Sequence, residues 1–120
     1  MTKVLIVDDA KLMHKLLTGI LSQREVEITS AYDGNEAIEA VKKAKPDIIF
    51  LDVVMPNKDG METLKELKLI YPDIKVLMAS SMGTKEKIID ALRIGAIGFL
   101  QKPYDEDVLL SKFDEIIMKG

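Results

Sequence analysis

Short runs of apolar residues alternate along this chain with longer stretches in which apolar residues recur every three to five positions. The apolar runs cover residues 3–7, 26–31, 48–54, 74–79 and 97–100, and the second of them alternates weakly with polar residues. Short runs rich in Val, Ile and Phe predict strands, and continuous runs predict strands buried on both faces. The stretches between them predict helices over residues 11–23, 34–45, 60–71, 85–94 and 106–117.

The order of these elements is strand then helix, five times over, without a linker, an internal repeat or a low-complexity tract. Such alternation predicts an α/β fold in which helices cover both faces of a parallel sheet through right-handed crossovers. A common form of such a sheet is the flavodoxin-like, doubly wound arrangement, here with five helices and five strands in the order 2-1-3-4-5. The length of 120 residues suits a single domain covering residues 1–120.

The periodic stretches also predict which helix positions face the core. The first, fourth and fifth helices are each expected to bury an apolar face, and His14 is expected at the solvent or the rim. The residues expected in these faces are Leu12, Leu16, Leu17, Ile20 and Leu21, then Ile88 and Leu92 with Ile89 beside them, then Val108, Leu109, Phe113, Ile116 and Ile117.

Composition and charge exclude several classes of function. The absence of cysteine excludes disulfides and thiolate sites, and a single histidine leaves no His-rich metal site. A net charge of −3 argues against general nucleic-acid binding. The first apolar run is too short for a signal peptide or a membrane span, so we expect a cytoplasmic protein that does not enter a membrane.

Reactive polar residues follow the carboxyl ends of the predicted strands. Asp8 and Asp9 follow the first strand, Asp52 lies at the end of the third, and Ser80 and Lys102 follow the fourth and the fifth. In the expected strand order these ends meet at the switch point, where ligands of such folds bind. Three carboxylates in one cleft repel each other, so positive charge is needed. Mg²⁺ suits carboxylate oxygens, and Lys102 supplies a second positive charge.

Carboxylates, Mg²⁺, a lysine and a hydroxyl around one point indicate a phosphoryl site. Neither glycine-rich phosphate motif occurs, so the phosphoryl group is expected on the protein itself. Asp52 is the predicted nucleophile, with Asp8 and Asp9 on the metal side. Structural alternatives stay open: the aspartates could cap helices or end a strand in solvent, and Ser80 could be a loop hydroxyl with Ser81 as its rival.

These segments resemble the receiver domain of the two-component response regulators, and most of all the single-domain chemotaxis type. The resemblance covers the whole chain, and together its motifs are highly specific. The residues that carry it are Val4-Leu5-Ile6-Val7-Asp8-Asp9, Asp47-Ile48-Ile49-Phe50-Leu51-Asp52-Val53-Val54-Met55-Pro56, Asp59-Gly60, Ser80 and Lys102-Pro103. The resemblance implies that a sensor histidine kinase or a phosphotransfer protein supplies the phosphoryl group to Asp52 in a Mg²⁺-dependent reaction.

The resemblance also implies a role for each residue of the site. The expected metal ligands are Asp8, Asp9, Asp52 and the backbone carbonyl of Val54. Ser80 is expected to move to the phosphoryl group and Lys102 to pair with its oxygens. Phe99 takes the aromatic switch position, which turns inward when Ser80 moves, and the bond before Pro103 is expected to be cis.

Three positions depart from common members of the resembled family. Phe99 stands where tyrosine is common, so its switching would rest on packing without a hydroxyl. Val54 and Met82 stand at two positions that orient water for hydrolysis of the phosphoryl group, and neither carries a strong polar group. We therefore predict slow self-dephosphorylation.

The resulting function is a phosphorylation-controlled binding module, with no enzyme activity beyond its own phosphorylation and dephosphorylation. Its output is expected at the surface of the fourth helix, fifth strand and fifth helix, which would signal a downstream protein. We expect a monomer or a weak phosphorylation-dependent dimer, without direct nucleic-acid contact. Three alternatives stay open: a phosphoester hydrolase, disfavoured by Val54 and the missing cap; an unphosphorylated scaffold; and a receiver excised from a longer transcriptional or hybrid regulator.

Overall fold

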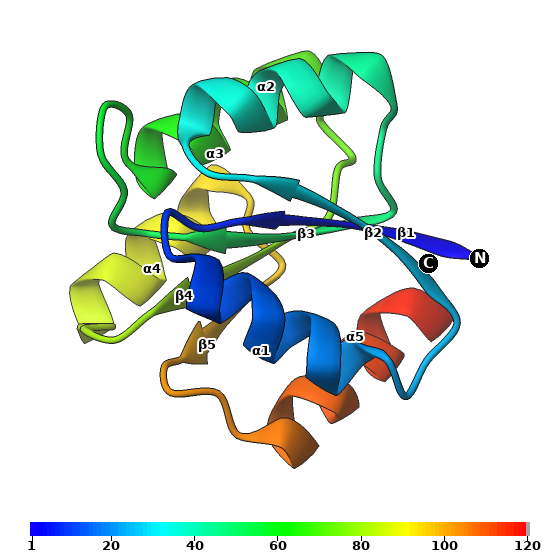
Figure 1. Ribbon diagram of the computed structural model, residues 1–120. Coiled ribbons are helices and arrows are strands. Elements are labelled where there is room, and N and C mark those ends of the chain that lie inside the picture. Colours follow the sequence, from blue (N-terminus) through cyan, green and yellow to red (C-terminus); the bar gives the residue numbers. More distant parts are fainter. Residues whose placement is uncertain (120) are drawn as a thin grey trace.

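A computed structural model describes residues 1–119, the last by its backbone alone, so Gly120 of the expected domain lies outside the described residues. Within that range the strands are β1 (Thr2–Val7), β2 (Val26–Ala31), β3 (Ile48–Asp52), β4 (Val76–Ser80) and β5 (Gly98–Gln101). The helices are α1 (Lys11–Leu21), α2 (Gly34–Lys43), α3 (Gly60–Ile70), α4 (Lys85–Ile94) and α5 (Glu106–Lys119). All strand pairs are parallel in the order β2-β1-β3-β4-β5, which confirms the predicted fold (Figure 1).

Helices cover both faces of the sheet, because the inner strands β1, β3 and β4 carry buried apolar residues on both of their faces. On one face α2, α3 and α4 pack on one set of strand residues, and on the other α1 and α5 pack on the alternate set (Figure 1). Residues of β1, β3 and β4 that face α2 and α3 include Leu5, Val7, Ile49, Leu51, Val76 and Met78. Their neighbours facing α1 and α5 are Val4, Ile6, Ile48, Phe50, Leu77 and Ala79. The alternation follows from the period of two in a strand.

Side-chain caps fix the starts of α2, α3 and α4. Asp33, Asp59 and Thr84 each accept a hydrogen bond from a backbone N–H of the first turn, at 2.8, 2.9 and 3.2 Å. These bonds satisfy donors that a helix start leaves unpaired. Aspartate and threonine are among the residues preferred at this position, because a side-chain oxygen can accept such a bond. Among the described residues no helix has the length and apolar character to cross a membrane.

The helix α1 buries a narrower stripe than the sequence predicts. Leu12 is 64% exposed and Leu16 is 45% exposed, whereas His14, Leu17 and Leu21 are buried. The buried residues are spaced by three and four positions, which is one line along a helix, and the two exposed leucines lie off that line. The prediction that His14 lies at the solvent or the rim is wrong, since it is 5% exposed.

The structure also differs from the sequence prediction in α4, in α5 and at two element boundaries. Ala91 is the buried residue of α4, while Leu92 and Ile89 are exposed, and Val108 of α5 is exposed rather than in the core. Apolar residues that lie beside the buried stripe of α1, α4 or α5 stay in solvent. The structure also ends α1 two residues earlier than predicted and starts β4 at Val76 rather than at residue 74.

Candidate phosphoryl site at the carboxyl ends of the strands

The carboxyl ends of the strands point to the left in Figure 1, where the loops before the helices lie. The strand register decides which side chains meet there. Val7 pairs with Leu51, so Asp8 and Asp52, each one residue further along, follow adjacent positions of β1 and β3. Asp52 in turn pairs with Ala79, next to Ser80, and Ser80 pairs with Gln101, next to Lys102. The predicted gathering of Asp8, Asp52, Ser80 and Lys102 is what the register produces.

Lys102 bridges the two buried carboxylates. Its Nζ lies 2.6 Å from Oδ2 of Asp8 and 3.2 Å from Oδ1 of Asp52. Both aspartates are buried, and the Lys102 side chain is 13% exposed, so the contacts form largely out of water. The other Asp8 oxygen accepts the backbone N–H of Ala10 at 2.9 Å. Charge-assisted bonds of this kind are about twice as strong as neutral ones.

Asp9 adds a third carboxylate and makes the cluster suitable for a cation. One oxygen from each of Asp8, Asp9 and Asp52 lies within 4.8 Å of the other two. Asp9 is exposed, whereas the other two are buried, so the cluster opens to solvent on the Asp9 side. Three carboxylates facing one lysine leave negative charge in excess, which favours a hard divalent cation with oxygen ligands.

Burial and charge act in opposite directions on Asp52. Burial is the largest influence and raises the pKa of Asp52, and the charge of Asp8 raises it further. Lys102, by its charge and its hydrogen bond, and the backbone N–H of Val54 lower this pKa without cancelling the rise. A carboxylate whose charged form is disfavoured by burial is stabilised when positive charge lies beside it or when a bond to its oxygen neutralises its charge.

The loop after β3 approaches the site so closely that glycine is needed at its end. The backbone N–H of Gly60 donates to the carbonyl of Val53 at 2.8 Å. A Cβ at Gly60 would lie 2.1 Å from the carbonyl oxygen of Asp52, so no other residue fits without moving the backbone. Val54, between these points, is exposed. This close approach is visible only in three dimensions.

The opposite side of the site is formed by β4, β5 and the loop after each. Ser80 is buried, and its Oγ accepts the backbone N–H of Met82 at 3.0 Å. The backbone N–H of Lys102 donates to the Ser80 carbonyl at 2.9 Å, and the Lys102–Pro103 peptide bond is cis. Phe99 is half-buried and packs against the core beneath α3 and α4. Ser80 and Phe99 thus lie on neighbouring strands, while Ser81 is exposed.

Two residues near the site were missed from the sequence. Nε2 of His14 donates to the carbonyl of Asp8 at 2.7 Å, and its Nδ1 lies 2.9 Å from the Ser30 hydroxyl. The ring also packs on Tyr32 at 4.4 Å between centroids. Burial first, then the charges of Asp8 and Asp52, raise the pKa of Tyr104 well above its usual range. The spacing of His14 with Leu17 and Leu21 was the available signal for its burial.

Fold and site together define a class: a doubly wound α/β protein whose switch point holds a lysine-bridged, cation-compatible acidic cluster beside a buried serine. The model of the response regulator receiver domain matches residues 4–114. The chemotaxis protein CheY of Listeria monocytogenes is 37% identical over 116 residues, which cover 96% of this chain and 98% of that protein. The chain therefore belongs to the response regulator receiver domain family.

Two further comparisons extend this result. A crystal structure of the CheX–CheY–BeF3–Mg complex from Borrelia burgdorferi aligns with a TM-score of 0.92 and 33% identity, covering 97% of this chain and 89% of that one. The protein-glutamate methylesterase/protein-glutamine glutaminase of Pyrococcus horikoshii is 42% identical over 123 residues, 98% of this chain but 33% of that protein. The chain is thus a chemotaxis-like receiver with phosphoacceptor function in two-component signalling.

Proposed function

We propose that Asp52 is the residue that accepts the phosphoryl group. The observation that carries the proposal is its position: a buried carboxylate at the end of the central strand, 3.2 Å from Lys102, whose charged form is disfavoured by burial. An Asp52 carboxylate oxygen would attack the phosphorus of a phosphohistidine, and the nitrogen–phosphorus bond would break as the imidazole leaves. The product is an acyl phosphate on Asp52.

Asp8, Asp9 and Asp52, with the Val54 carbonyl, would hold Mg²⁺. The carboxylate oxygens within 4.8 Å of each other support this ligand set, because oxygen donors suit this cation. Bound Mg²⁺ would offset the negative charge that gathers as the phosphoryl group arrives. Lys102 would exchange its contact with the Asp52 carboxylate for contact with the phosphoryl oxygens, while it keeps its bond to Asp8.

Ser80 and Phe99 would couple the site to the surface. The Ser80 hydroxyl would turn to the phosphoryl group, and the half-buried Phe99 would follow into the core by packing alone. The surface that changes would be that of α4, β5 and α5, where apolar residues are exposed to a partner. These exposed residues are Ile89, Leu92, Ile97 and Val108.

The test of the acceptor is intact mass after incubation with acetyl phosphate. Wild type with Mg²⁺ should gain one phosphoryl group, and the gain should be absent without Mg²⁺ and in Asp52→Asn. Asp47→Asn is the matched control, because Asp47 precedes the same strand at its far end and accepts the Lys3 N–H at 2.7 Å. A gain in Asp52→Asn, or none in wild type under confirmed Mg²⁺ binding, would contradict the proposal and favour a scaffold.

We further propose that the phosphoryl group is lost slowly. Val54 is 62% exposed and Met82 is 70% exposed, so both lie where water would approach, and neither bonds it strongly. The lifetime is read from the decay of the phosphorylated mass after the donor is removed. A lifetime of seconds at neutral pH without a phosphatase would contradict slow hydrolysis and leave the acceptor assignment intact.

The partners follow from the same proposal. A sensor histidine kinase or a phosphotransfer protein would donate the phosphoryl group, and a downstream protein would read the changed surface in the cytoplasm. We propose that residues 1–120 act as one receiver domain, as a monomer or a weak phosphorylation-dependent dimer. Beyond its own phosphorylation and dephosphorylation, the chain would catalyse no reaction.

A further inference from the structure

Residues 81–83, which join β4 to α4, are held to the end of β5 by side chains. Nε2 of Gln101 donates to the carbonyl of Ser81 at 3.0 Å. The ring of Phe99 lies so close to Gly83 that a Cβ there would be 2.7 Å from Cε1 of the ring and 3.2 Å from Oε1 of Gln101. The segment therefore contacts β5 at both its first and its last residue.

This segment is the direct continuation of Ser80. The Ser80 hydroxyl also accepts the N–H of Met82, so serine, loop and strand end form one bonded unit. If the Ser80 hydroxyl turns toward a phosphoryl group on Asp52, the Ser81–Met82 peptide must either move with it or lose the bond from the Met82 N–H. The Ser81 carbonyl that Gln101 holds belongs to this same peptide. A hydrogen bond at 3.0 Å has little room to stretch before it weakens.

We propose that Gln101 is a positioning residue for the phosphoryl reaction: its amide holds residues 81–83 against β5 and so opposes the movement of Ser80 toward Asp52. The inference rests on the proposed function and adds a residue to it. Within residues 1–119 the amide of Gln101 bonds Ser81 rather than Asp52 or the carboxylate cluster, so Gln101 acts through Ser81. Because this hydrogen bond is exposed to water, we expect its loss to change the free energy by less than the loss of a typical hydrogen bond would.

The experiment is a titration with beryllofluoride, a mimic of the phosphoryl group, at saturating Mg²⁺. Gln101→Met keeps the length of the side chain and removes the donor. The control is Gln23→Met, the other glutamine of the chain, whose amide also bonds a backbone carbonyl but at the end of α1. We expect Gln101→Met to bind about two- to fivefold more tightly than wild type, and Gln23→Met to bind like wild type.

A second measurement separates positioning from a general loss of stability. Amide exchange at Met82 should accelerate severalfold in Gln101→Met and not in Gln23→Met, since only the first frees the loop. If wild type binds beryllofluoride and Gln101→Met binds it equally well or more weakly, the proposed role of Gln101 is overturned. Failure of wild type itself to bind would instead defeat the proposed function.

Discussion

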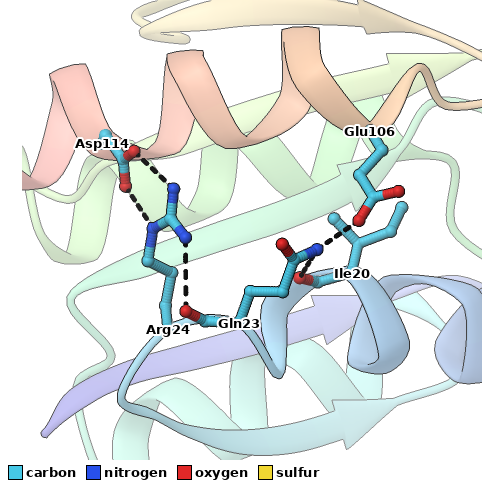
Figure 2. A network of polar contacts seen from close by, with 5 residues as sticks. All are labelled: Ile20, Gln23, Arg24, Glu106 and Asp114. Atoms are coloured by element: carbon cyan, nitrogen blue, oxygen red, sulfur yellow. Dashed lines mark hydrogen bonds and ion pairs between the residues drawn. The ribbon is translucent and has the colours of Figure 1, made fainter.

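Two charged networks in this molecule use similar chemistry in different surroundings. In one, Lys102 bridges Asp8 and Asp52 at the carboxyl ends of the strands, with side chains that are 13%, 3% and 9% exposed. In the other, Arg24 makes two bonds of 2.8 Å to Asp114 of α5, with side chains 35% and 39% exposed (Figure 2). The exposed network has the better paired geometry, and the buried one has the excess of carboxylates.

The aspartates of the two networks respond in opposite directions. The hydrogen bond from Arg24 lowers the pKa of Asp114, whereas burial raises the pKa of Asp52 in spite of Lys102. Water already stabilises an exposed carboxylate, so a guanidinium adds to that effect. A buried carboxylate has lost water, and a lysine shared between two carboxylates does not replace it. The difference teaches that burial, more than the presence of a partner, decides the direction in which the pKa of the aspartate moves.

The exposed network has a structural role. Gln23 bonds the carbonyl of Ile20 and the carboxylate of Glu106, and Arg24 also bonds the Gln23 carbonyl at 3.2 Å (Figure 2). These bonds join the turn after α1 to α5 at two places, Glu106 at the start of the helix and Asp114 near its middle. Surface pairs of this type contribute little to stability, so this network orders two helices more than it stabilises them.

The largest effect is expected when the lysine of the buried network is removed. Lys102→Met should lower the free energy of unfolding at neutral pH by about 3 kcal/mol, because two buried carboxylates lose their partner. The loss should shrink as the pH falls, since protonation of Asp52, whose pKa burial already raises, removes part of the uncompensated charge. Urea unfolding of wild type and variant across pH measures this. An equal loss at every pH would assign the effect to packing of the lysine stem.

The next effect has the opposite sign. Asp52→Asn should raise the free energy of unfolding at neutral pH by about 1–2 kcal/mol without Mg²⁺, because the cost of burying the charge is removed. The folded pKa of Asp52 is raised, so its contribution to stability is fully present below the unfolded pKa and is lost as the pH rises through the folded pKa. The advantage of the variant should therefore grow with pH and vanish in acid. A variant less stable than wild type at neutral pH would show that the bond to Lys102 outweighs burial.

Mg²⁺ should produce a smaller, stabilising change that depends on the exposed carboxylate. At three times its Kd the ion should stabilise wild type by about 0.8 kcal/mol. Asp9→Asn should largely remove this response, and because Asp9 is exposed the substitution should leave the ion-free melting temperature almost unchanged. Thermal unfolding with and without Mg²⁺ measures both. Ca²⁺ and Na⁺ titrations show whether the response belongs to divalent charge, and an undiminished response in the variant would remove Asp9 from the ligand set.

The smallest effect is expected in the exposed network. Arg24→Met should change the melting temperature by an amount typical of surface substitutions, and the change should shrink further at high salt because the pair is screened. Comparing it with Lys102→Met in the same buffers sharpens the contrast between the networks. If Arg24→Met lost as much stability as Lys102→Met, the junction of α1 and α5 would contribute more to stability than its exposure suggests.

The sequence by itself determined the fold class and which polar residues gather at the site. Apolar runs of strand length alternating with helical periods allow few topologies. Each polar residue proposed for the site lies at the carboxyl end of a strand or just after it. Asp8, Asp52, Ser80 and Lys102 could therefore be grouped before the structure was known. The signals that act here are local: the length of each apolar run, the period of apolar residues between the runs, and the polar residues at the end of each run.

Tertiary structure decided what depends on contacts between distant segments. The exposure of Leu12 and Leu16 and the burial of His14 depend on which line of α1 meets the sheet, and a helix with apolar residues on two lines does not settle that alone. The close approach of Gly60 to Asp52, and the bond from Gln101 to Ser81, depend on where two backbones pass each other. Most of all, the pKa of Asp52 depends on the burial that four strands and their loops create together, which no stretch of sequence contains.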